Sequence, residues 1–206
     1  MSERVSLETE RPATQPASRP RARAAPPAAG VIRLEPHACF ACGELNEIGL
    51  RLQFHPVPDG CWAELVLPER FEGFEGIAHG GILSTIMDEV MTWSLTARDY
   101  WGVTARLSLT FRRPVRIGQR IRAEGWIVED RRRVVTTAGR VVDVETGVEL
   151  ASAEGTFVTA SGTDRRRLRD RYGDLAERRS AAERETAQAA PAGAPATASA
   201  GAVERP

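Results

Sequence analysis

Apolar residues recur at helical spacing between residues 82 and 95 of this chain. They lie three or four residues apart, as on a helix with one buried stripe: Ile82, Leu83, Ile86, Met87, Val90, Met91 and Leu95. The run Asp99-Tyr100-Trp101-Gly102 then ends the pattern. We therefore predict one long helix, apolar enough to need cover on most sides.

Strand-like segments lie on both sides of this helix in the sequence. Residues 50–54 and 62–67 broadly alternate between apolar and polar, as half-buried strands do. Segments rich in Val and Thr follow the helix, at about 103–112, 119–129, 133–144 and 148–160, and Glu145-Thr146-Gly147 favours a turn between the last two. This order predicts an α+β domain whose antiparallel sheet wraps one side of the helix, with a partner subunit on the other.

The two ends of the chain differ in composition from this core. Residues 1–30 are rich in Pro, Ala, Arg and Ser, and we expect a disordered tail there. Residues 163–206 begin with a charged stretch that can form a solvated helix or stay as coil, and they end in an Ala/Pro-rich stretch. One domain is expected between the tails, at residues 31–162.

Charge and hydropathy exclude several classes of function. The chain has 28 basic and 28 acidic residues and a formal net charge of +0, which leaves no electrostatic footprint for nucleic acid. Its longest apolar run is far shorter than the roughly 20 residues that span a bilayer. The N-terminus carries no apolar signal core, and three cysteines do not make a disulfide framework. We expect a cytoplasmic protein without nucleic-acid or membrane partners.

His79-Gly80-Gly81 stands directly before the helix, and Asp88-Glu89 lies in its middle. Glycines at a helix start let a ligand approach free N–H groups, where the helix dipole favours a developing negative charge. Asp88 is a candidate base, but it follows His79 by nine residues, about 13 Å along the helix axis. A base must come within about 3 Å of its proton. The spacing therefore suggests a site shared between two antiparallel helices of a dimer.

Three stretches of the chain together resemble a known enzyme family. They are Cys39-Phe40-Ala41-Cys42-Gly43 with residues 46–52, residues 74–83 with Asp88-Glu89, and residues 102–115 with Gly118. The segment 39–159 is similar to hotdog-fold acyl-CoA thioesterases of the 4-hydroxybenzoyl-CoA thioesterase-like superfamily, in the phenylacetyl-CoA thioesterase branch. The resemblance implies a hotdog fold, hydrolysis of an acyl-CoA without a cofactor, and a homodimer or dimer of dimers with shared active sites.

The resemblance also implies roles for single residues. Asp88 would be the general base or the nucleophile, and the helix N-terminus near Gly80 and Gly81 the oxyanion site. His79 would hold the helix start or contact substrate. Thr104 would help to place the attacking water, although an ordinary strand threonine explains it equally well.

Two further positions bear on the same site. Many relatives have an Asn six residues before the His, where this chain has Gly73, which leaves open how the water or the thioester carbonyl is oriented. Glu89 points about 100° away from Asp88 around the helix, so it is structural or shares the substrate site. Asp88 itself lies on a polar stripe with Ser84, Thr85 and Thr92, which by composition alone fits a wetted helix face.

Arginines gather after the helix, at Arg106, Arg112, Arg113 and Arg116. Arginine forms bidentate contacts with phosphate, so the group is a candidate site for the phosphates of coenzyme A. A charged strand face that keeps the protein soluble is the alternative. For the acyl group, Trp93, Met91, Phe74 and Trp101 are candidate lining residues, and they fit an aromatic or a medium aliphatic chain.

His37, Cys39 and Cys42 have the residue types and spacing of zinc ligands. The sequence offers no evident fourth ligand, and family resemblance favours a segment that covers the domain edge or the substrate groove. We therefore expect no metal and no cofactor. A non-catalytic acyl-CoA-binding sensor or scaffold, and a dimerisation module with recruiting tails, are the alternatives to the enzyme.

Overall fold

One antiparallel sheet of six strands dominates the computed structural model, which describes residues 30–131 and 133–173. Its strands are β1 (His55–Val57), β2 (Gly60–Val66), β3 (Gly102–Phe111), β4 (Arg120–Arg131), β5 (Val134–Asp143) and β6 (Glu149–Thr159), in the spatial order β1-β2-β4-β5-β6-β3. The helices are α1 (Gly80–Ser94) and α2 (Gly162–Tyr172), with 3₁₀ turns η1 (Glu69–Phe71) and η2 (Leu95–Arg98).

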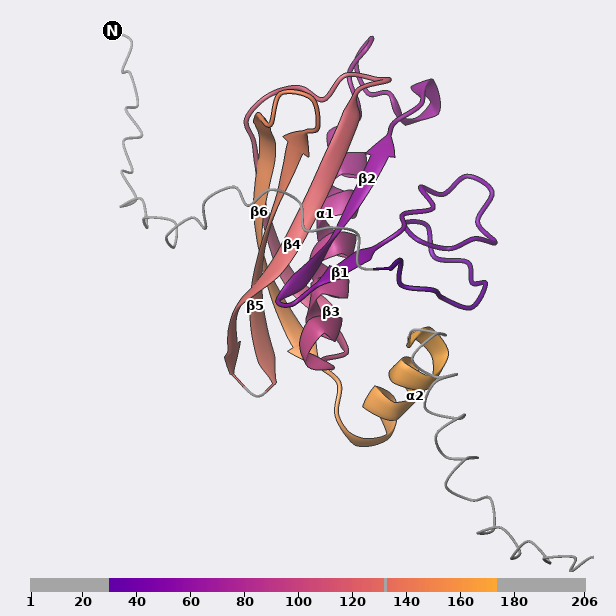
Figure 1. The fold of residues 1–206 in the computed structure, drawn as a ribbon, viewed down its shortest axis with the longest axis vertical. Helices are drawn as coiled ribbons and strands as arrows, with labels where there is room; N and C mark the ends of the chain where they lie inside the picture. The colour runs from indigo at the N-terminus through magenta and orange to yellow at the C-terminus, as the bar shows by residue number, and fades with distance from the viewer. Residues whose placement is uncertain (1–29, 132, 174–206) are drawn as a thin grey trace, which may run out of the picture.

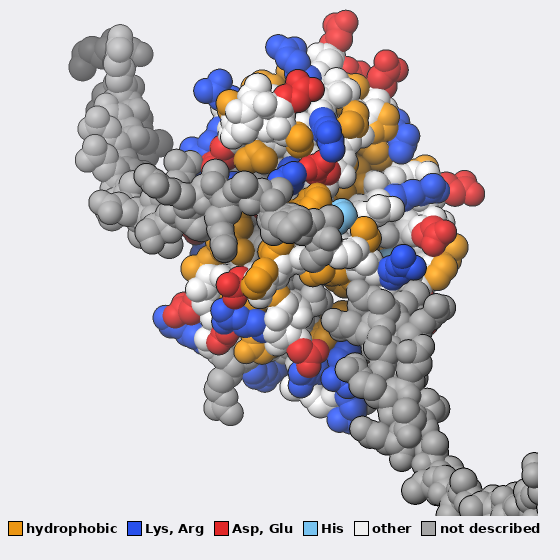
Figure 2. All heavy atoms as spheres, in the orientation of Figure 1, with side chains coloured by type: hydrophobic (Ala, Val, Ile, Leu, Met, Phe, Trp, Pro, Cys, Tyr) orange, Lys and Arg blue, Asp and Glu red, His pale blue; other side chains and the backbone are white. Residues whose placement is uncertain are grey.

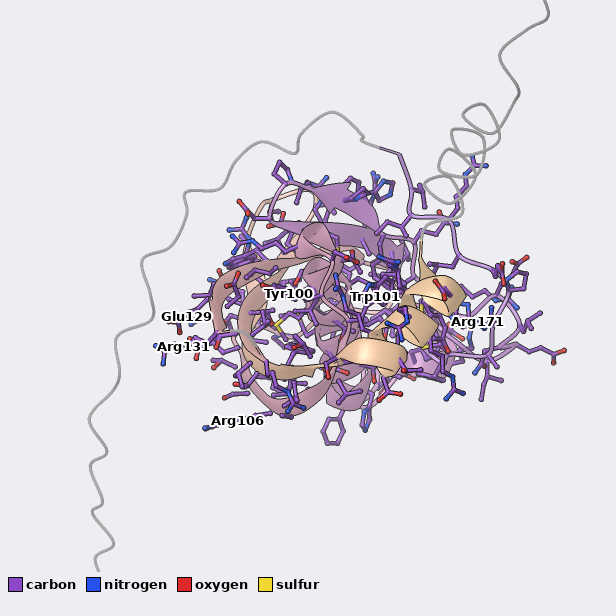
Figure 3. The ribbon with its side chains drawn as sticks, turned by 90° about the horizontal axis from the view of Figure 1, so that it is seen from below. Tyr100, Trp101, Arg106, Glu129, Arg131 and Arg171 are labelled. Atoms are coloured by element: carbon purple, nitrogen blue, oxygen red, sulfur yellow. The ribbon has the colours of Figure 1, made fainter. Side chains whose placement is uncertain are left out.

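Helix α1 lies across one face of the sheet, and the sheet curves around it when seen end-on (Figures 1 and 3). Its buried side chains pack mainly over β4, β2 and β5. Gly125 on β4 permits a close approach, because a Cβ there would lie 2.6 Å from the carbonyl oxygen of Val90. The predicted fold class, an antiparallel sheet wrapped around one long helix, is confirmed.

The helix begins two residues before its first apolar position, at Gly80, and continues through η2. It ends at Asp99, whose φ of 53° is left-handed and reverses the chain into β3. The buried residues Leu83, Ile86, Met87, Val90 and Met91 are those that the periodicity marks. The predicted helix is confirmed.

The four strands after the helix also lie where the Val- and Thr-rich segments predict them, within two residues at each end. The prediction of a strand at 50–54 is wrong, because only His55–Val57 pairs with β2. Arg51 has a left-handed φ of 54°, and the N–H groups of Leu50 and Leu52 donate to carbonyls of Phe40 and Ala41 instead. The alternation in this segment reflects the burial of Leu52 and Phe54 beneath a loop, not strand pairing.

The charged stretch after the domain forms α2, which has no buried residue and lies beyond one end of the sheet (Figure 1). Arg165 pairs with Asp99, and Arg171 with Glu35 at 3.2 Å. Residues 1–29 of the expected tail and the rest of the charged stretch lie outside the described residues. Neither described helix is long and apolar enough to cross a bilayer. Figure 2 shows acidic and basic side chains intermixed on the visible face.

Candidate active site

His79 caps the N-terminus of α1 with its imidazole. Its Nδ1 accepts a hydrogen bond from the N–H of Gly81 at 2.9 Å. The loop before it is fixed by backbone bonds, from Ala78 N–H to Val115 and from His79 N–H to Phe71, both at 2.9 Å. The side chain therefore holds the helix start, one of the two roles considered from sequence.

This cap decides which N–H of the first turn faces solvent without a partner. The N–H of Gly81 is taken by His79, and those of Ile82 and Leu83 donate to the His79 carbonyl at 2.9 and 3.3 Å. Among the described residues, none accepts from the N–H of Gly80, which is exposed. The group available for a ligand oxygen is thus on Gly80 rather than on Gly81.

The carboxylate of Asp88 accepts a hydrogen bond from a residue of β3. The hydroxyl of Thr104 donates to its Oδ1 at 2.6 Å, and both side chains are half-buried. The register of β3 against β6 shifts between Thr104 and Arg106, so Ala105 forms a bulge. Such bulges re-aim side chains. Here the bulge lets Thr104 face α1 while Arg106 lies exposed.

The hydroxyl groups of the polar stripe around Asp88 form their hydrogen bonds within the helix. The hydroxyls of Ser84, Thr85 and Thr92 donate to the carbonyls of Gly80, Gly81 and Asp88, at 2.9, 3.0 and 2.8 Å. Threonine and serine commonly bond back to the preceding turn in this way. These hydroxyls therefore leave the Asp88 carboxylate to Thr104.

Gly73 packs directly against His79. A Cβ on Gly73 would lie 3.0 Å from the Cα of His79 and 3.3 Å from its Cδ2. Such contacts are tighter than ordinary side-chain packing, so a side chain at residue 73 would require His79 to shift slightly.

The candidate phosphate-binding arginines do not act as one group. Arg112 donates to Glu149 at 2.7 Å and to the hydroxyl of Ser152 at 3.2 Å. No ion pair joins Arg106 or Arg113 to another described residue, and Figure 3 shows Arg106 projecting outward from the sheet. Arg106 and Arg113 thus remain as candidates, whereas Arg112 is already paired.

A cavity of about 200 Å³ lies beside the C-terminal half of α1, next to Glu89. Trp93, Trp101 and Tyr172 contribute to its lining, and Figure 3 shows Trp101 beside α2. Of the residues expected around the acyl group, Trp93 and Trp101 line this cavity, Met91 is fully buried and Phe74 is 84% exposed. Asp88 is not part of the lining, although Thr92, one turn further along the same stripe, is.

Glu89 is oriented towards this cavity by contacts that sequence reasoning missed. Its Oε1 accepts from the indole N–H of Trp93 at 2.9 Å, and the thiol of Cys39 lies 3.9 Å away. The spacing of four residues between Glu89 and Trp93 could have indicated the first contact. Burial, together with the nearby Glu89 and Cys39, raises the pKa of the Cys42 thiol.

Comparison with known proteins agrees with this geometry. Residues 75–150, from the loop before α1 to the start of β6, match the profile of a family described as the thioesterase superfamily. This segment is therefore similar to the thioesterase superfamily. Among curated protein sequences, none matches the chain.

Solved structures of the thioesterase superfamily share the fold. A protein described as a thioesterase superfamily protein has a TM-score of 0.55 and 24% identity, over 57% of this chain and 61% of that chain, so less than two thirds of that relative is spanned. A Streptococcus mutans protein solved with acetyl-CoA has a TM-score of 0.51 and 20% identity, over 58% of this chain and 98% of that chain.

A third similar structure is a hypothetical thioesterase from Streptococcus pneumoniae, solved with coenzyme A. Its TM-score is 0.50 and its identity 19%, over 53% of this chain and 86% of that chain. At these identities the comparisons establish the hotdog fold of the chain. The chemistry of its site has to be argued from its own residues.

Proposed function

We propose that this protein hydrolyses the thioester of an acyl-CoA. The observation that carries the proposal is the Asp88 carboxylate, which a β3 hydroxyl holds at 2.6 Å on a helix that is otherwise mostly apolar. Coenzyme A and acetyl-CoA in two structures of the same fold support CoA as the carrier. A carboxylate and an unpartnered N–H at a helix start are the two groups that thioester hydrolysis needs.

In the proposed reaction the thioester carbonyl oxygen accepts from the N–H of Gly80 of one subunit. Asp88 of a second subunit removes a proton from water, which attacks the carbonyl carbon. The tetrahedral intermediate carries its negative charge on the oxygen at Gly80 and near the helix N-terminus, where it is stabilised. Collapse breaks the carbon–sulfur bond, and the CoA thiolate takes up the proton to leave as the thiol.

Direct attack by the carboxylate is the other route. It forms an acyl–Asp88 anhydride, which water then hydrolyses. A single turnover in ¹⁸O-water distinguishes the two routes. General-base catalysis places the label in the released acid, whereas attack of water at the aspartyl carbon of an anhydride places it in Asp88 instead.

The test is thiol release from a panel of acyl-CoAs that includes aryl-acetyl and medium aliphatic groups, with an acyl-carrier-protein thioester for comparison. Asp88→Asn preserves shape but removes the base, so kcat should fall by about 10²-fold or more while the fold is retained. Asp164→Asn on the exposed α2 is the matched control and should leave kcat unchanged. Near-normal turnover by Asp88→Asn excludes the assignment.

Gly73 favours a second candidate, a non-catalytic acyl-CoA-binding protein. The chain lacks at this position the amide that many relatives have, and a Cβ added there would press against His79, at 3.0 Å from its Cα. Such a protein would bind acyl-CoA in titration calorimetry but release no thiol from any member of the panel. The same two measurements on the wild-type chain therefore separate the candidates.

A further inference from the structure

Four potential metal ligands meet between the loop at residues 37–43 and the middle of α1. The sulfurs of Cys39 and Cys42 and a carboxylate oxygen of Glu89 all lie within 4.8 Å of one another, although Glu89 is about fifty residues away in sequence. The Nε2 of His37 lies 3.3 Å from the sulfur of Cys42. The three metal-ligand candidates are half-buried, and His37 is buried.

We propose that these residues bind a structural zinc ion, with Cys39, Cys42 and Glu89 as ligands and His37 as the fourth donor. Zinc bonds of about 2.0–2.3 Å imply separations of roughly 3.4–3.8 Å between ligand atoms of a tetrahedral site. The sulfur of Cys39 lies 3.9 Å from Glu89 Oε1, and Nε2 of His37 lies 3.3 Å from the sulfur of Cys42. Two of the distances between ligand atoms are thus already close to those of a tetrahedral zinc site.

The chemistry of the donors selects the metal. Two thiolates with an imidazole and a carboxylate form a soft, mixed set that suits zinc and is unsuited to magnesium or calcium, which take oxygen ligands. Without a cation, two thiolates beside a carboxylate would repel one another. Zinc removes that repulsion, and coordination by zinc deprotonates the thiols outright.

The histidine and the glutamate are already oriented by outer contacts. Nδ1 of His37 lies 2.9 Å from the backbone carbonyl of Glu35, which fixes the proton on Nδ1 and directs the lone pair of Nε2 towards Cys42. The indole N–H of Trp93 holds the Glu89 carboxylate. Metal-binding histidines and carboxylates usually have such partners. The ring of His37 must move closer to Cys39 and Glu89 on binding, since only the other three atoms lie mutually within 4.8 Å.

The loop that carries Cys39 and Cys42 forms a tight turn, which brings the two cysteines close to each other. The N–H of Gly43 donates to the carbonyl of Cys39 at 2.9 Å. A Cβ on Gly43 would lie only 2.4 Å from the carbonyl oxygen of His37 and 2.5 Å from that of Cys39. Glycine after the second cysteine therefore lets the loop close around its own sulfurs.

The site would join two parts of the molecule that are far apart in sequence. Cys39 and Cys42 belong to the loop before β1, whereas Glu89 follows Asp88 directly on α1. The ring of Tyr172 on α2 stands edge-on to His37 at a centroid distance of 5.5 Å. A zinc ion here would hold the loop and α2 against the helix that carries the candidate carboxylate.

The test uses the untagged full-length chain, reduced, reconstituted with zinc and freed of excess metal. Elemental analysis should find about one zinc per chain. Reconstitution with Co²⁺ should give the visible ligand-field bands of a tetrahedral site and a near-ultraviolet thiolate-to-cobalt band. A chain that binds no zinc, or one in which mass spectrometry finds a Cys39–Cys42 disulfide that prevents binding, overturns the proposal.

Variants assign the ligands. Cys39→Ser, Cys42→Ser and Glu89→Gln should each lower zinc affinity by at least 10-fold, and the cysteine variants should also weaken the thiolate band. Cys61→Ser is the matched control: Cys61 is buried elsewhere, with its thiol donating to the Val90 carbonyl at 3.2 Å, and zinc binding should be unchanged. Wild-type affinity in either cysteine variant overturns the site, and wild-type affinity in His37→Ala removes His37 from it.

A second measurement remains informative if a variant folds poorly. Chelation should lower the melting temperature of the wild-type chain and have little effect on Cys42→Ser. Equal sensitivity of both to the chelator would contradict a structural zinc at this site. Metal content, cobalt spectra and melting do not depend on thioester hydrolysis, so the site stands or falls separately from the proposed activity.

Discussion

The Asp88 carboxylate is bonded by a side chain from β3 and not by a neighbour on its own helix. The threonine and serine hydroxyls of α1 are turned back onto helix carbonyls, so Thr104 alone among the hydroxyls described here reaches Oδ1. A donor on Oδ1 fixes the plane of the carboxylate and leaves Oδ2 free to accept a proton. In the proposed mechanism, Thr104 is therefore a positioning residue for the base.

The corresponding prediction concerns Thr104→Val, which keeps the branched shape and removes the hydroxyl. A charge-assisted hydrogen bond contributes about 1.5–3 kcal/mol, so kcat should fall by roughly 10- to 100-fold with KM nearly unchanged. Thr104→Ser retains the donor and should restore most of kcat. A parallel loss of kcat in both variants would show that Thr104 acts through packing instead.

Asp143 at the end of β5 provides a pH-dependent prediction. Hydrogen bonds from the Gln119 amide and from the hydroxyl and N–H of Thr146 lower its pKa to about 2. A carboxyl group with a depressed pKa stabilises the fold above its unfolded pKa of about 3.9, and that contribution is lost as the pH falls through about 2. Asp143→Asn should thus be less stable than wild type at pH 6.

The difference between the two proteins should then shrink as the pH falls from about 4 to about 2, because the wild-type carboxyl becomes protonated. Urea unfolding at several pH values in this range measures it. A difference that stays constant down to pH 2 would mean that the carboxylate charge does not contribute and that only the shape of the side chain matters.

The packing of α1 on β4 depends on glycine at the scale of whole elements. A Cβ on Gly125 would meet backbone atoms of Val90 and Met91, at 2.6 to 3.0 Å, which no rotamer change can relieve. Gly125→Ala should therefore push the helix away from the sheet and lower the free energy of unfolding by about 1–3 kcal/mol or more. Chemical denaturation measures this.

Gly30→Ala is the control for this prediction, since nothing lies within 4 Å of the added methyl group. It should leave stability within about 0.5 kcal/mol of wild type. If Gly125→Ala were equally harmless, the close approach of helix and sheet would not be needed for stability.

The elements themselves were largely predictable because their patterns are local. The periodicity of Ile86 to Met91 marks the buried face of α1, and segments rich in Val and Thr mark β4 to β6. The bulge at Ala105 was not predictable, because it depends on how β3 pairs with β6. The contact of Cys39 with Glu89 was equally hidden, since it joins a loop to a helix about fifty residues away and no periodicity records it.

In the candidate site, too, the residues could be predicted from sequence but some of their contacts could not. The sequence pointed to His79, Asp88 and Thr104, and the structure brings Thr104 and Asp88 together within 2.6 Å. It could not show that the His79 imidazole occupies the N–H of Gly81, because the cap depends on a side-chain rotamer. Nor could it show that Arg112 is paired with Glu149, which comes from a neighbouring strand.

At the scale of the whole molecule, the two halves of the candidate site are too far apart to act within one chain. Asp88 follows Gly80 by eight residues on one regular helix, a separation of about 12 Å along its axis. The sheet covers one side of α1, and Asp88 lies at the margin of that cover, where it is half-buried and bonded to the edge strand β3. A second copy with its helix antiparallel would bring its Asp88 to the first copy's Gly80.

Mixing two inactive variants tests this shared site. One parent is Asp88→Asn, and the other is Gly80→Val, whose side chain obstructs the N–H while a Cβ there meets only the Phe111 ring, at 3.6 Å. Random reassortment makes about half of the dimers mixed, and each mixed dimer has one site with both defects and one with none. Co-expression should therefore restore about a quarter of wild-type turnover. If mixed dimers form, as native mass spectrometry would show, and turnover stays absent, then Asp88 and Gly80 do not meet across the subunits. The carboxylate would then have to act on a thioester bound within its own chain, at a group other than Gly80.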